Sequence, residues 1–531
     1  MRKLGRAEMA VSDTAASARA VKDTAKLFSA RMAAAAFSVF FTGWLLRLIP
    51  TEQLAVWPIA VALAAAVEAL ASLGMGDTFV RRIPRHLAEG KRDEAGALLR
   101  TGLLLNIVAC AVVTALLTIS PTWTARHLIG DASQTAIISS LVIMVFLNAL
   151  EKRFRWGLTA TQQFGRMAVL DLFGRVARMP LAVALYLHSG LSGLLLAFAI
   201  VPAISCAATL ALLWPYMRRA HGFAPVGELL SFSAAFYGVS VLGFLRGRAQ
   251  YLVVGVLTSP EVLGLYFVAS KVSDYLRELG GFGIGAVTPK LAERGGTSPE
   301  ERPRILRECS RYLLLVMLPM HLGIAVLAVP IVRIYAGADY ASAGIILSVL
   351  AIYAWFELAY SLHRAHIQVY APPVHLLVLQ AVSAGLDLLT MAVLVLLLGA
   401  LGAAVAKLIT YAALSVVAAA FLARTVPLRY DLQALNSALV AGTALSLVCY
   451  AAAMLAPRAS IAVVTGTLLG TAAYIIALRG RVSVRDLDLL FGALPGRVRD
   501  GRPVARLRSM VSRWLMPEPE VTGGAAGDGA T

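Results

Sequence analysis

The sequence predicts an all-α integral membrane protein with about fourteen transmembrane helices, arranged as two six-helix lobes followed by two C-terminal helices. Three observations lead to this fold class: the composition, the distribution of basic residues and an internal repeat. Hydrophobic residues make up 59% of the 531 residues and charged residues only 15%, below the usual quarter for soluble domains. The apolar runs are long and continuous rather than alternating at every second residue, which favours helices over barrel strands.

Each apolar run is close to the roughly 20 residues that a helix needs to cross a bilayer. The expected spans are 27–49, 53–75, 97–119, 134–151, 167–187, 190–214, 232–256, 262–287, 311–332, 341–362, 374–398, 401–423, 434–455 and 460–478. They divide the chain into a cytoplasmic N-terminal arm (1–26), an N-lobe (27–214), a cytoplasmic linker (215–231), a C-lobe (232–423), two further helices (434–478) and a basic cytoplasmic tail with a disordered end (479–531). The first run is long enough to span, so residues 1–26 are not expected to be a cleavable signal peptide.

The basic residues are sorted between alternate loops. The chain has 48 Lys and Arg, 30 Asp and Glu, and a formal charge of +18. Most basic residues fall in the arm, in every second loop and in the tail, whereas the other loops hold or adjoin only Arg47, Arg126, Arg333 and Arg458. Since basic residues beside spanning helices stay in the cytoplasm, both termini are predicted to be cytoplasmic in an inner membrane. This sorting accounts for the charge, so nucleic-acid binding is not expected.

The chain offers few features of an enzyme. The predicted outer loops are short, for example 188–190 and 397–402, and no loop is large enough for an active site. The four cysteines (Cys110, Cys206, Cys309 and Cys449) have neither metal-ligand nor redox spacing, and a GxxxxGK[ST] motif is absent. We therefore expect no catalytic residue, metal or cofactor, and place the function between the helices.

An internal repeat appears when the second span is aligned with the eighth at a constant offset of 209 residues. The matched pairs are Glu52 with Glu261, Leu54 with Leu263, Trp57 with Tyr266, Gly74 with Gly283, Gly76 with Gly285, Arg81 with Lys290 and Arg85 with Arg294. Six spans separate the copies, so both cross the membrane in the same direction. This is the parallel type of repeat, related by an axis along the membrane normal.

Two segments carry a resemblance to a known family. RLIPTEQLAVWPIA…SLGMGDTFVRRIPRHLAEGKRDEA (47–95) and TSPEVLGLYFVASKVSDYL…TPKLAE (258–293) resemble the signature regions of bacterial polysaccharide exporters. These are O-antigen-type lipid-linked oligosaccharide flippases of the multidrug/oligosaccharidyl-lipid/polysaccharide (MOP) exporter superfamily. The resemblance extends to about residue 425. The chain departs from the family at Gln250 and Tyr251, where many members carry Asp-Arg. Fourteen helices are also similar to the lipid II flippase branch, whose two extra helices are thought to accommodate a lipid tail.

Charged residues inside the spans are the candidate functional residues, because each costs about 2.5–3.5 kcal/mol near the centre of a helix. The basic ones are Arg31, Arg175, Arg178, Arg246, Arg248, Lys271, Arg277 and Lys407, and the acidic ones are Glu68, Asp171, Asp274, Glu278, Glu357 and Asp387. A cationic patch of Arg246, Arg248, Lys271, Arg277 and Arg31 is the candidate headgroup site, since the Arg fork matches phosphate oxygens. The alternatives are structural ion pairs and, for Arg31, a boundary charge.

Arg246 and Arg248 lie two residues apart, so on a regular helix they point about 200° from each other. They can face one cavity only if the helix is distorted, and Gly247 makes a distortion plausible. Gating or ion-pair roles are assigned to Glu68, Asp274, Asp171, Arg175, Asp387 and Lys407. The spacing predicts local pairs of Asp171 with Arg175 and of Asp274 with Arg277, and a pair of Asp387 with Lys407 across a hairpin. The repeat also places Glu68 opposite Arg277 as a switchable pair.

These features predict a flippase that moves undecaprenyl-pyrophosphate-linked oligosaccharide by alternating access. Its expected partners are the lipid-linked substrate, membrane lipids and, in the pathway, a polymerase and glycosyltransferases, and a monomer is expected. The alternatives are a cation-coupled drug antiporter on the same fold, a lipid II-type flippase, a membrane-embedded glycosyltransferase or polymerase, and a scaffold with a degenerate cavity. Helix one offers Arg31 and no acid, which argues against binding of organic cations.

Overall fold

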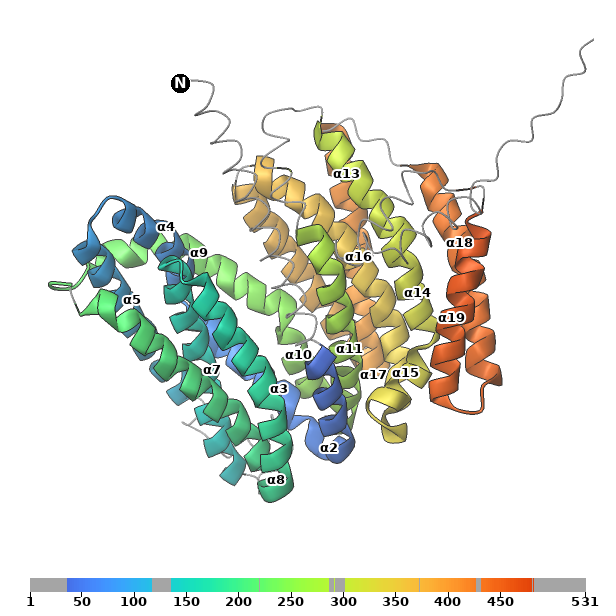
Figure 1. Cartoon of the computed structure of the whole chain (residues 1–531), viewed down its shortest axis with the longest axis horizontal. Helices are drawn as coiled ribbons and strands as arrows, with labels where there is room; N and C mark the ends of the chain where they lie inside the picture. The colour runs from blue at the N-terminus through green and yellow to red at the C-terminus, as the bar shows by residue number, and fades with distance from the viewer. Residues whose placement is uncertain are drawn as a thin grey trace, which may run out of the picture. The chain divides into compact units, whose positions relative to one another are not determined.

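The computed structural model describes residues 36–116, 135–218, 220–285, 291, 301–371, 373–425, 431–479 and 481. In this part of the chain every regular element is a helix (Figure 1), which confirms the all-α fold class. The chain forms two compact units. Unit 1 comprises Met1–Val272, Val332–Leu350 and Ala371–Thr410, and unit 2 comprises Ser273–Ile331, Ala351–Tyr370 and Tyr411–Thr531. The division into lobes at 27–214 and 232–423 stays a prediction.

Unit 1 is built mainly from the first half of the sequence. After a short apolar helix, Ala36–Leu48, come α2 (Thr51–Leu54), α3 (Val56–Leu70), α4 (Met75–Ala88), α5 (Arg92–Leu116), α7 (Thr135–Ala160), α8 (Phe164–Met217), α9 (Val226–Gly247), α10 (Ala249–Leu257) and α11 (Pro260–Gly285), whose last turns belong to unit 2. A buried cluster that includes Phe79, Leu99, Leu158 and Leu213 joins α4, α5, α7 and α8. This cluster holds the helices on which most of the unit 1 charges lie.

The bend between α3 and α4 depends on a glycine. The two helices form an angle of 51°, and Gly74 between them has φ +68°, a backbone conformation that favours glycine. A Cβ at Gly74 would collide with the backbone carbonyl of Ser233 on α9. Gly74 therefore permits both the bend and the close approach of α9. Its repeat counterpart, Gly283, lies inside α11, so the two copies differ here.

Unit 2 contains α13 (Glu301–Tyr312), the π-helical turn η3 (Leu313–Met317), α14 (Leu318–Val326), α18 (Leu432–Leu455) and α19 (Ala459–Ala477), with the later parts of α16 (Ala343–Tyr370) and α17 (Pro373–Thr425). The short α15 (Ala328–Tyr335) follows α14 and continues into unit 1 at Val332, and the 3₁₀ turn η4 (Ala338–Tyr340) belongs to unit 1. The Trp355 indole N–H donates a hydrogen bond to the Leu313 carbonyl in η3, at 3.0 Å. A π-helical turn changes the i→i−4 hydrogen-bond pattern, and here a side chain binds its first carbonyl.

Helices α8 and α17 each contain a chain reversal at a glycine. Gly190 has φ 60° and ψ −140°, and Gly399 has φ 58° and ψ −135°. Three residues after each reversal another glycine, Gly193 or Gly402, packs so closely on the backbone carbonyl of Leu185 or Leu394 that a Cβ would not fit. The reversals fall within the predicted loops at 188–190 and 397–402, so each long element consists of two helices in a tight hairpin.

Corresponding helices of the two repeat copies begin at equivalent positions. α5 begins at Arg92 and α13 at Glu301; α8 begins at Phe164 and α17 at Pro373; both pairs are separated by the same 209 residues as Gly190 and Gly399. The repeat that the sequence shows in the second and eighth spans thus continues through the helices that follow, without an insertion in either copy.

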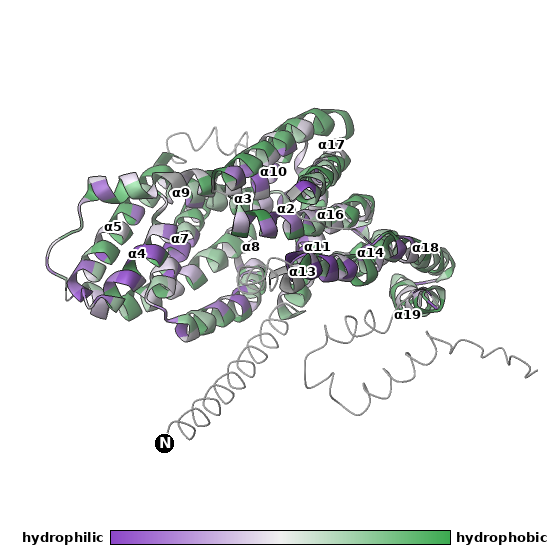
Figure 2. Ribbon diagram, turned by 90° about the horizontal axis from the view of Figure 1, so that it is seen from above, coloured by the Kyte–Doolittle hydropathy of each residue, from purple (hydrophilic) through white to green (hydrophobic). Residues whose placement is uncertain are grey.

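Seven helices of the described part are long and apolar enough to cross a membrane, or up to nine if each bent pair counts as one span. α8 and α17 are among the seven, whereas α11 is not, since it carries four charged residues between Lys271 and Glu278. The multi-pass helical architecture is confirmed, and the count of fourteen stays a prediction. Figure 2 shows α17, α18 and α19 as hydrophobic over most of their length, and hydrophilic residues concentrated on α4 and α13.

Candidate functional site

Arg246 and Arg248 lie on either side of a break in the helix. α9 ends at Gly247, and Arg248, with φ −128° and ψ −20°, is the cap between α9 and α10. The distortion predicted at Gly247 is therefore present. Both arginines are half-buried, and within the described part of the chain Arg246 forms no ion pair. A half-buried guanidinium without a carboxylate partner retains its capacity to bind an anion.

Two positions just after the break, Gln250 and Tyr251, are neutral and differ from the family pattern. Gln250 and Tyr251 are both buried, and the Tyr266 hydroxyl donates a hydrogen bond to Gln250 Oε1 at 2.8 Å. Lys271 lies on the following helix with its Nζ 5.1 Å from the centre of the Phe267 ring. That ring packs against Trp57, with ring centres 5.3 Å apart. On α10, Gln250 thus accepts a hydrogen bond from a tyrosine, and the Tyr251 ring packs against the rings of Tyr266 and Phe267.

A network of charges joins α3, α7 and α8 in unit 1. Glu68 on α3 forms ion pairs with Lys152 and with Arg153 (3.8 Å) on α7. Glu151 on the same helix pairs with Arg155 at 2.8 Å and with Arg178 at 3.4 Å. A further ion pair links Arg155 to Asp171 on α8. The network contains four basic and three acidic side chains, so it is nearly self-neutralising.

Sequence reasoning missed four members of this network. Glu151 is the last residue of the predicted span 134–151, and Lys152, Arg153 and Arg155 follow that span and so count with the cytoplasmic loop charges. In the structure α7 continues to Ala160. Arg153 is only 5% exposed, although loop charges are expected in water. The i,i+4 spacing of Glu151 and Arg155 was the available signal for a helix.

Arg277 is the centre of the charged cluster in unit 2. Its guanidinium binds Asp274 one turn earlier on α11 and Glu357 on α16, the latter at 2.8 Å. The Tyr353 hydroxyl donates to the same Glu357 oxygen, also at 2.8 Å, and its ring packs edge-on against Tyr411, with centres 5.1 Å apart. The local Asp274–Arg277 pair that the spacing predicts is present, and Glu357 is its additional partner.

Asp387 and Lys407 form the ion pair that the sequence predicts across a hairpin. Lys407 Nζ lies 3.2 Å from Asp387 Oδ2, and the two side chains are 4% and 2% exposed. Twenty residues along a straight helix would separate them by about 30 Å, so the pair depends on the reversal at Gly399. Thr390 and Thr410 form a second contact between the two halves of α17, with 3.1 Å between their hydroxyl oxygens.

The first copy of the repeat has different chemistry at these two positions. Arg178 corresponds to Asp387, and Phe198 corresponds to Lys407, at the offset of 209. The Arg178 guanidinium lies 5.6 Å from the centre of the Phe198 ring. An ion pair in one hairpin is therefore replaced by a cation–π contact in the other, between the same backbone positions.

The remaining predicted residues are placed as follows. Asp171 binds Arg155 on α7. Arg175 is exposed on α8, and the Asp171–Arg175 pair stays a prediction. Arg31 lies outside the described residues. The partners given above for Glu68 and Arg277 lie within their own units, and a switchable Glu68–Arg277 pair stays a prediction. Among the described residues no group of three His, Cys, Asp or Glu side chains is arranged to hold a metal ion.

The fold is that of a multi-pass helical membrane protein, and it is similar to the folds of several solved membrane proteins. The structure is similar to the lipid II flippase MurJ in an inward closed conformation (TM-score 0.70, 14% identity, 85% of this chain and 97% of that one). It is also similar to an inward-facing multidrug resistance MATE transporter of the MOP superfamily (TM-score 0.58, 14% identity, 72% of this chain and 92% of that one). A MOP superfamily transporter from Pyrococcus furiosus is similar as well (TM-score 0.54, 15% identity, 76% of this chain and 93% of that one).

The family follows from the sequence itself. The chain belongs to the family described as polysaccharide biosynthesis protein, whose model matches residues 44–345. Membership of a polysaccharide biosynthesis family, which the resemblance implies, is thereby confirmed, and the solved structures confirm the fold. No curated protein matches the chain significantly.

Proposed function

We propose that this protein is a flippase that moves undecaprenyl-pyrophosphate-linked oligosaccharide from the cytoplasmic to the periplasmic leaflet of a bacterial inner membrane, by alternating access. The observation that carries the proposal is the break in the helix between Arg246 and Arg248. Arg246 lies in an otherwise apolar segment and is half-buried. Its guanidinium has no carboxylate partner within the described part of the chain. Membership of the polysaccharide biosynthesis family supports the glycolipid as the class of substrate.

The chemistry of the substrate fits this arrangement. A pyrophosphate carries negative charge and planar sets of oxygens, which a guanidinium binds through two parallel hydrogen bonds. Most of the other buried basic groups already have acidic partners, as Arg277 and Lys407 do. A partnered cation contributes little net attraction, whereas an unpartnered one offsets the desolvation of the incoming anion. The polyprenyl chain would remain in lipid while the headgroup and sugars cross.

The setting of the transport step is part of the same proposal. Positive-inside sorting places both termini in the cytoplasm, where the oligosaccharide is assembled, and a polymerase and glycosyltransferases would act before and after translocation. No covalent chemistry is required. A lipid II-type substrate would share the pyrophosphate and differ in its sugars, so the test below includes both headgroups.

The test is translocation in proteoliposomes. The protein is reconstituted with a fluorescent polyprenyl-pyrophosphate oligosaccharide, and the fraction of lipid accessible to an impermeant quencher is followed over time. We expect Arg246→Ala to slow flipping about 10- to 100-fold, since a hydrogen bond to a charged group contributes about 1.5–3 kcal/mol. Arg85→Ala is the matched control, because Arg85 is an exposed arginine paired with Glu89.

Three results separate the possibilities. Loss of flipping in Arg246→Ala but not in Arg85→Ala supports both the function and the site. Flipping that neither substitution changes keeps the function and rejects the site. Absence of flipping by folded wild-type protein, with oligosaccharide and lipid II headgroups alike, rejects the flippase. Uptake of organic cations by the same vesicles would then point to the drug antiporter.

A further inference from the structure

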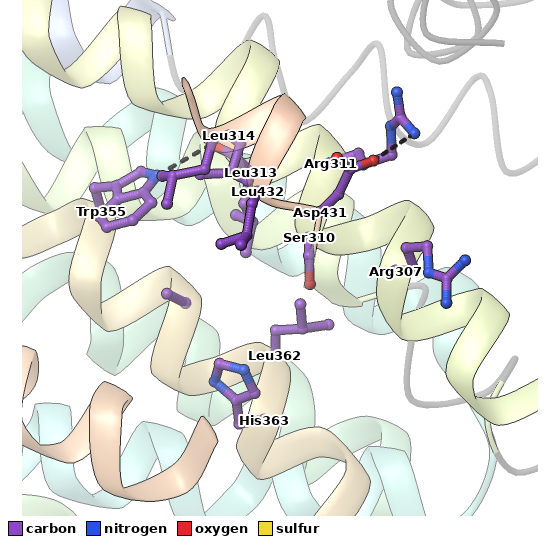
Figure 3. Close-up of a pocket in the computed structure, with 12 residues that line it drawn as sticks. Arg307, Ser310, Arg311, Leu313, Leu314, Trp355, Leu362, His363, Asp431 and Leu432 are labelled. Carbon is purple, nitrogen blue, oxygen red and sulfur yellow. Dashed lines mark hydrogen bonds and ion pairs between the residues drawn. The ribbon is translucent and has the colours of Figure 1, made fainter. Parts of the chain in front are cut away.

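A cavity in unit 2 is lined by none of the residues assigned to the substrate. A cavity of about 360 Å³ opens among α13, η3, α16 and the start of α18. Leu313, Trp355, Leu362 and Leu432 form much of its apolar wall, and Arg307, Arg311 and Asp431 lie at one side (Figure 3). The volume is at the lower end of the range for small-molecule sites, about 300–1,000 Å³.

The charges at the rim leave one positive group uncompensated. Arg311 Nη1 lies 2.8 Å from Asp431 Oδ2, so this pair is neutral overall. The other Asp431 oxygen accepts a hydrogen bond from the Ala434 N–H at 2.9 Å, which caps α18. Arg307 is exposed and forms no ion pair with a described residue. The rim therefore favours a ligand with one negative charge beside a hydrocarbon group.

The place of the cavity along the spans agrees with such a ligand. Arg311 and Asp431 stand where the predicted spans 311–332 and 434–455 begin at the cytoplasmic face. Basic pockets between helices at this face bind lipid headgroups. Trp355 combines an apolar ring with an N–H that binds the Leu313 carbonyl, as tryptophans at membrane interfaces do. An acyl chain can thus lie in the cavity with its phosphate at the rim.

We propose that this cavity binds one acyl chain of an anionic phospholipid, whose phosphodiester lies at Arg307. The cavity, about 360 Å³, is the size of a site for a small molecule. That corresponds to one acyl chain and is far too small for an undecaprenyl chain. The occupant is therefore a resident membrane lipid rather than the transported substrate, and the proposal does not depend on the proposed function.

The test measures lipid binding by the purified full-length protein in detergent, by native mass spectrometry and by the shift of the melting temperature. The added probes are phosphatidylglycerol, phosphatidylcholine and inorganic phosphate. We expect phosphatidylglycerol to bind and to raise the melting temperature, and the other two to do so weakly or not at all. Arg307→Ala should weaken phosphatidylglycerol binding about fivefold, the contribution of one basic residue near an anionic lipid.

Two variants control for nonspecific effects. Arg304→Ala removes another exposed arginine of α13, one that pairs with Glu301 and Glu308, and it should bind phosphatidylglycerol like the wild type. Ala359→Leu places a larger side chain in the wall of the cavity and should displace the lipid while leaving the charge unchanged.

Three results would overturn the proposal: equal binding of phosphatidylcholine, equal losses in Arg304→Ala and Arg307→Ala, or displacement of phosphatidylglycerol by an equimolar polyprenyl phosphate. None of these measurements depends on flipping, so a failure here would not bear on the flippase.

Discussion

Asp387 and Lys407 form the most deeply buried ion pair among the described residues. Removing two charges from water costs several kcal/mol for each ion, and their attraction repays this only when both are present. A buried pair is therefore sensitive to loss of one partner and tolerant of replacement of both. This asymmetry makes the role of the pair measurable.

At the residue scale we predict that Lys407→Met and Asp387→Leu each destabilise the protein by about 3–5 kcal/mol, because either leaves one buried charge without its partner. The double substitution should recover most of this loss. Thermal unfolding of the four proteins in detergent gives the comparison, with Glu89→Gln in the exposed Arg85–Glu89 pair as the control. Additive losses in the double variant would contradict the prediction.

Individual residues also show what sequence can predict about a site. The Asp274–Arg277 and Asp387–Lys407 pairs were predictable because helical spacing or a short hairpin fixes the separation of the two residues. Glu357 as the partner of Arg277 was not predictable, since this pair joins helices that are distant in sequence. The number of candidate partners in such a case is too large for local patterns to select one.

At the scale of elements, the two hairpins depend on paired glycines for different reasons. Gly190 and Gly399 adopt positive φ. A Cβ would meet open space at Gly190 and only an ordinary contact at Gly399. At Gly193 or Gly402, a Cβ would collide with a backbone carbonyl. The first pair requires a conformation, and the second requires close packing of two helices.

We predict that Gly193→Ala and Gly402→Ala are more harmful than Gly190→Ala and Gly399→Ala. Gly190→Ala and Gly399→Ala should each lower the free energy of unfolding by about 1–3 kcal/mol, because of backbone strain. Gly193→Ala and Gly402→Ala must instead push the two helices of the hairpin apart. The measurement is the melting temperature and the fraction of monodisperse protein in detergent. Gly165→Ala is the control, because this glycine of α8 has no neighbour within 4 Å. Equal effects at Gly190 and Gly193 would reject the distinction.

The irregular points of these helices differ in how well the sequence predicts them. The reversals at Gly190 and Gly399 lie in gaps between long apolar runs, so composition locates them. The continuation of α7 to Ala160 and the π-helical turn η3 leave no such mark. The π-helical turn has a tertiary contact, the hydrogen bond from Trp355 to Leu313, which the local sequence does not specify, whereas the i,i+4 spacing of Glu151 and Arg155 is the local signal for the continuation of α7.

At the scale of the whole molecule, the alternation of basic loops makes a prediction about topology. Ser189 lies in a predicted outer loop and Lys91 in a predicted cytoplasmic one, and both are exposed. With Cys309 replaced by serine, Ser189→Cys should react with an impermeant maleimide in intact spheroplasts, and Lys91→Cys only after permeabilisation. The other native cysteines are buried. Labelling of Lys91→Cys in intact spheroplasts would contradict the positive-inside assignment.

The repeat of equal length has a consequence for how the protein can be studied. Every residue of one copy has a counterpart in the other at a known position, so the molecule carries its own internal control. Gly190 and Gly399 show the common architecture, whereas Arg178 and Asp387 occupy equivalent places with opposite charge. Matched substitutions at such a pair compare the two copies under identical expression, lipid and substrate, and so measure the division of labour between them.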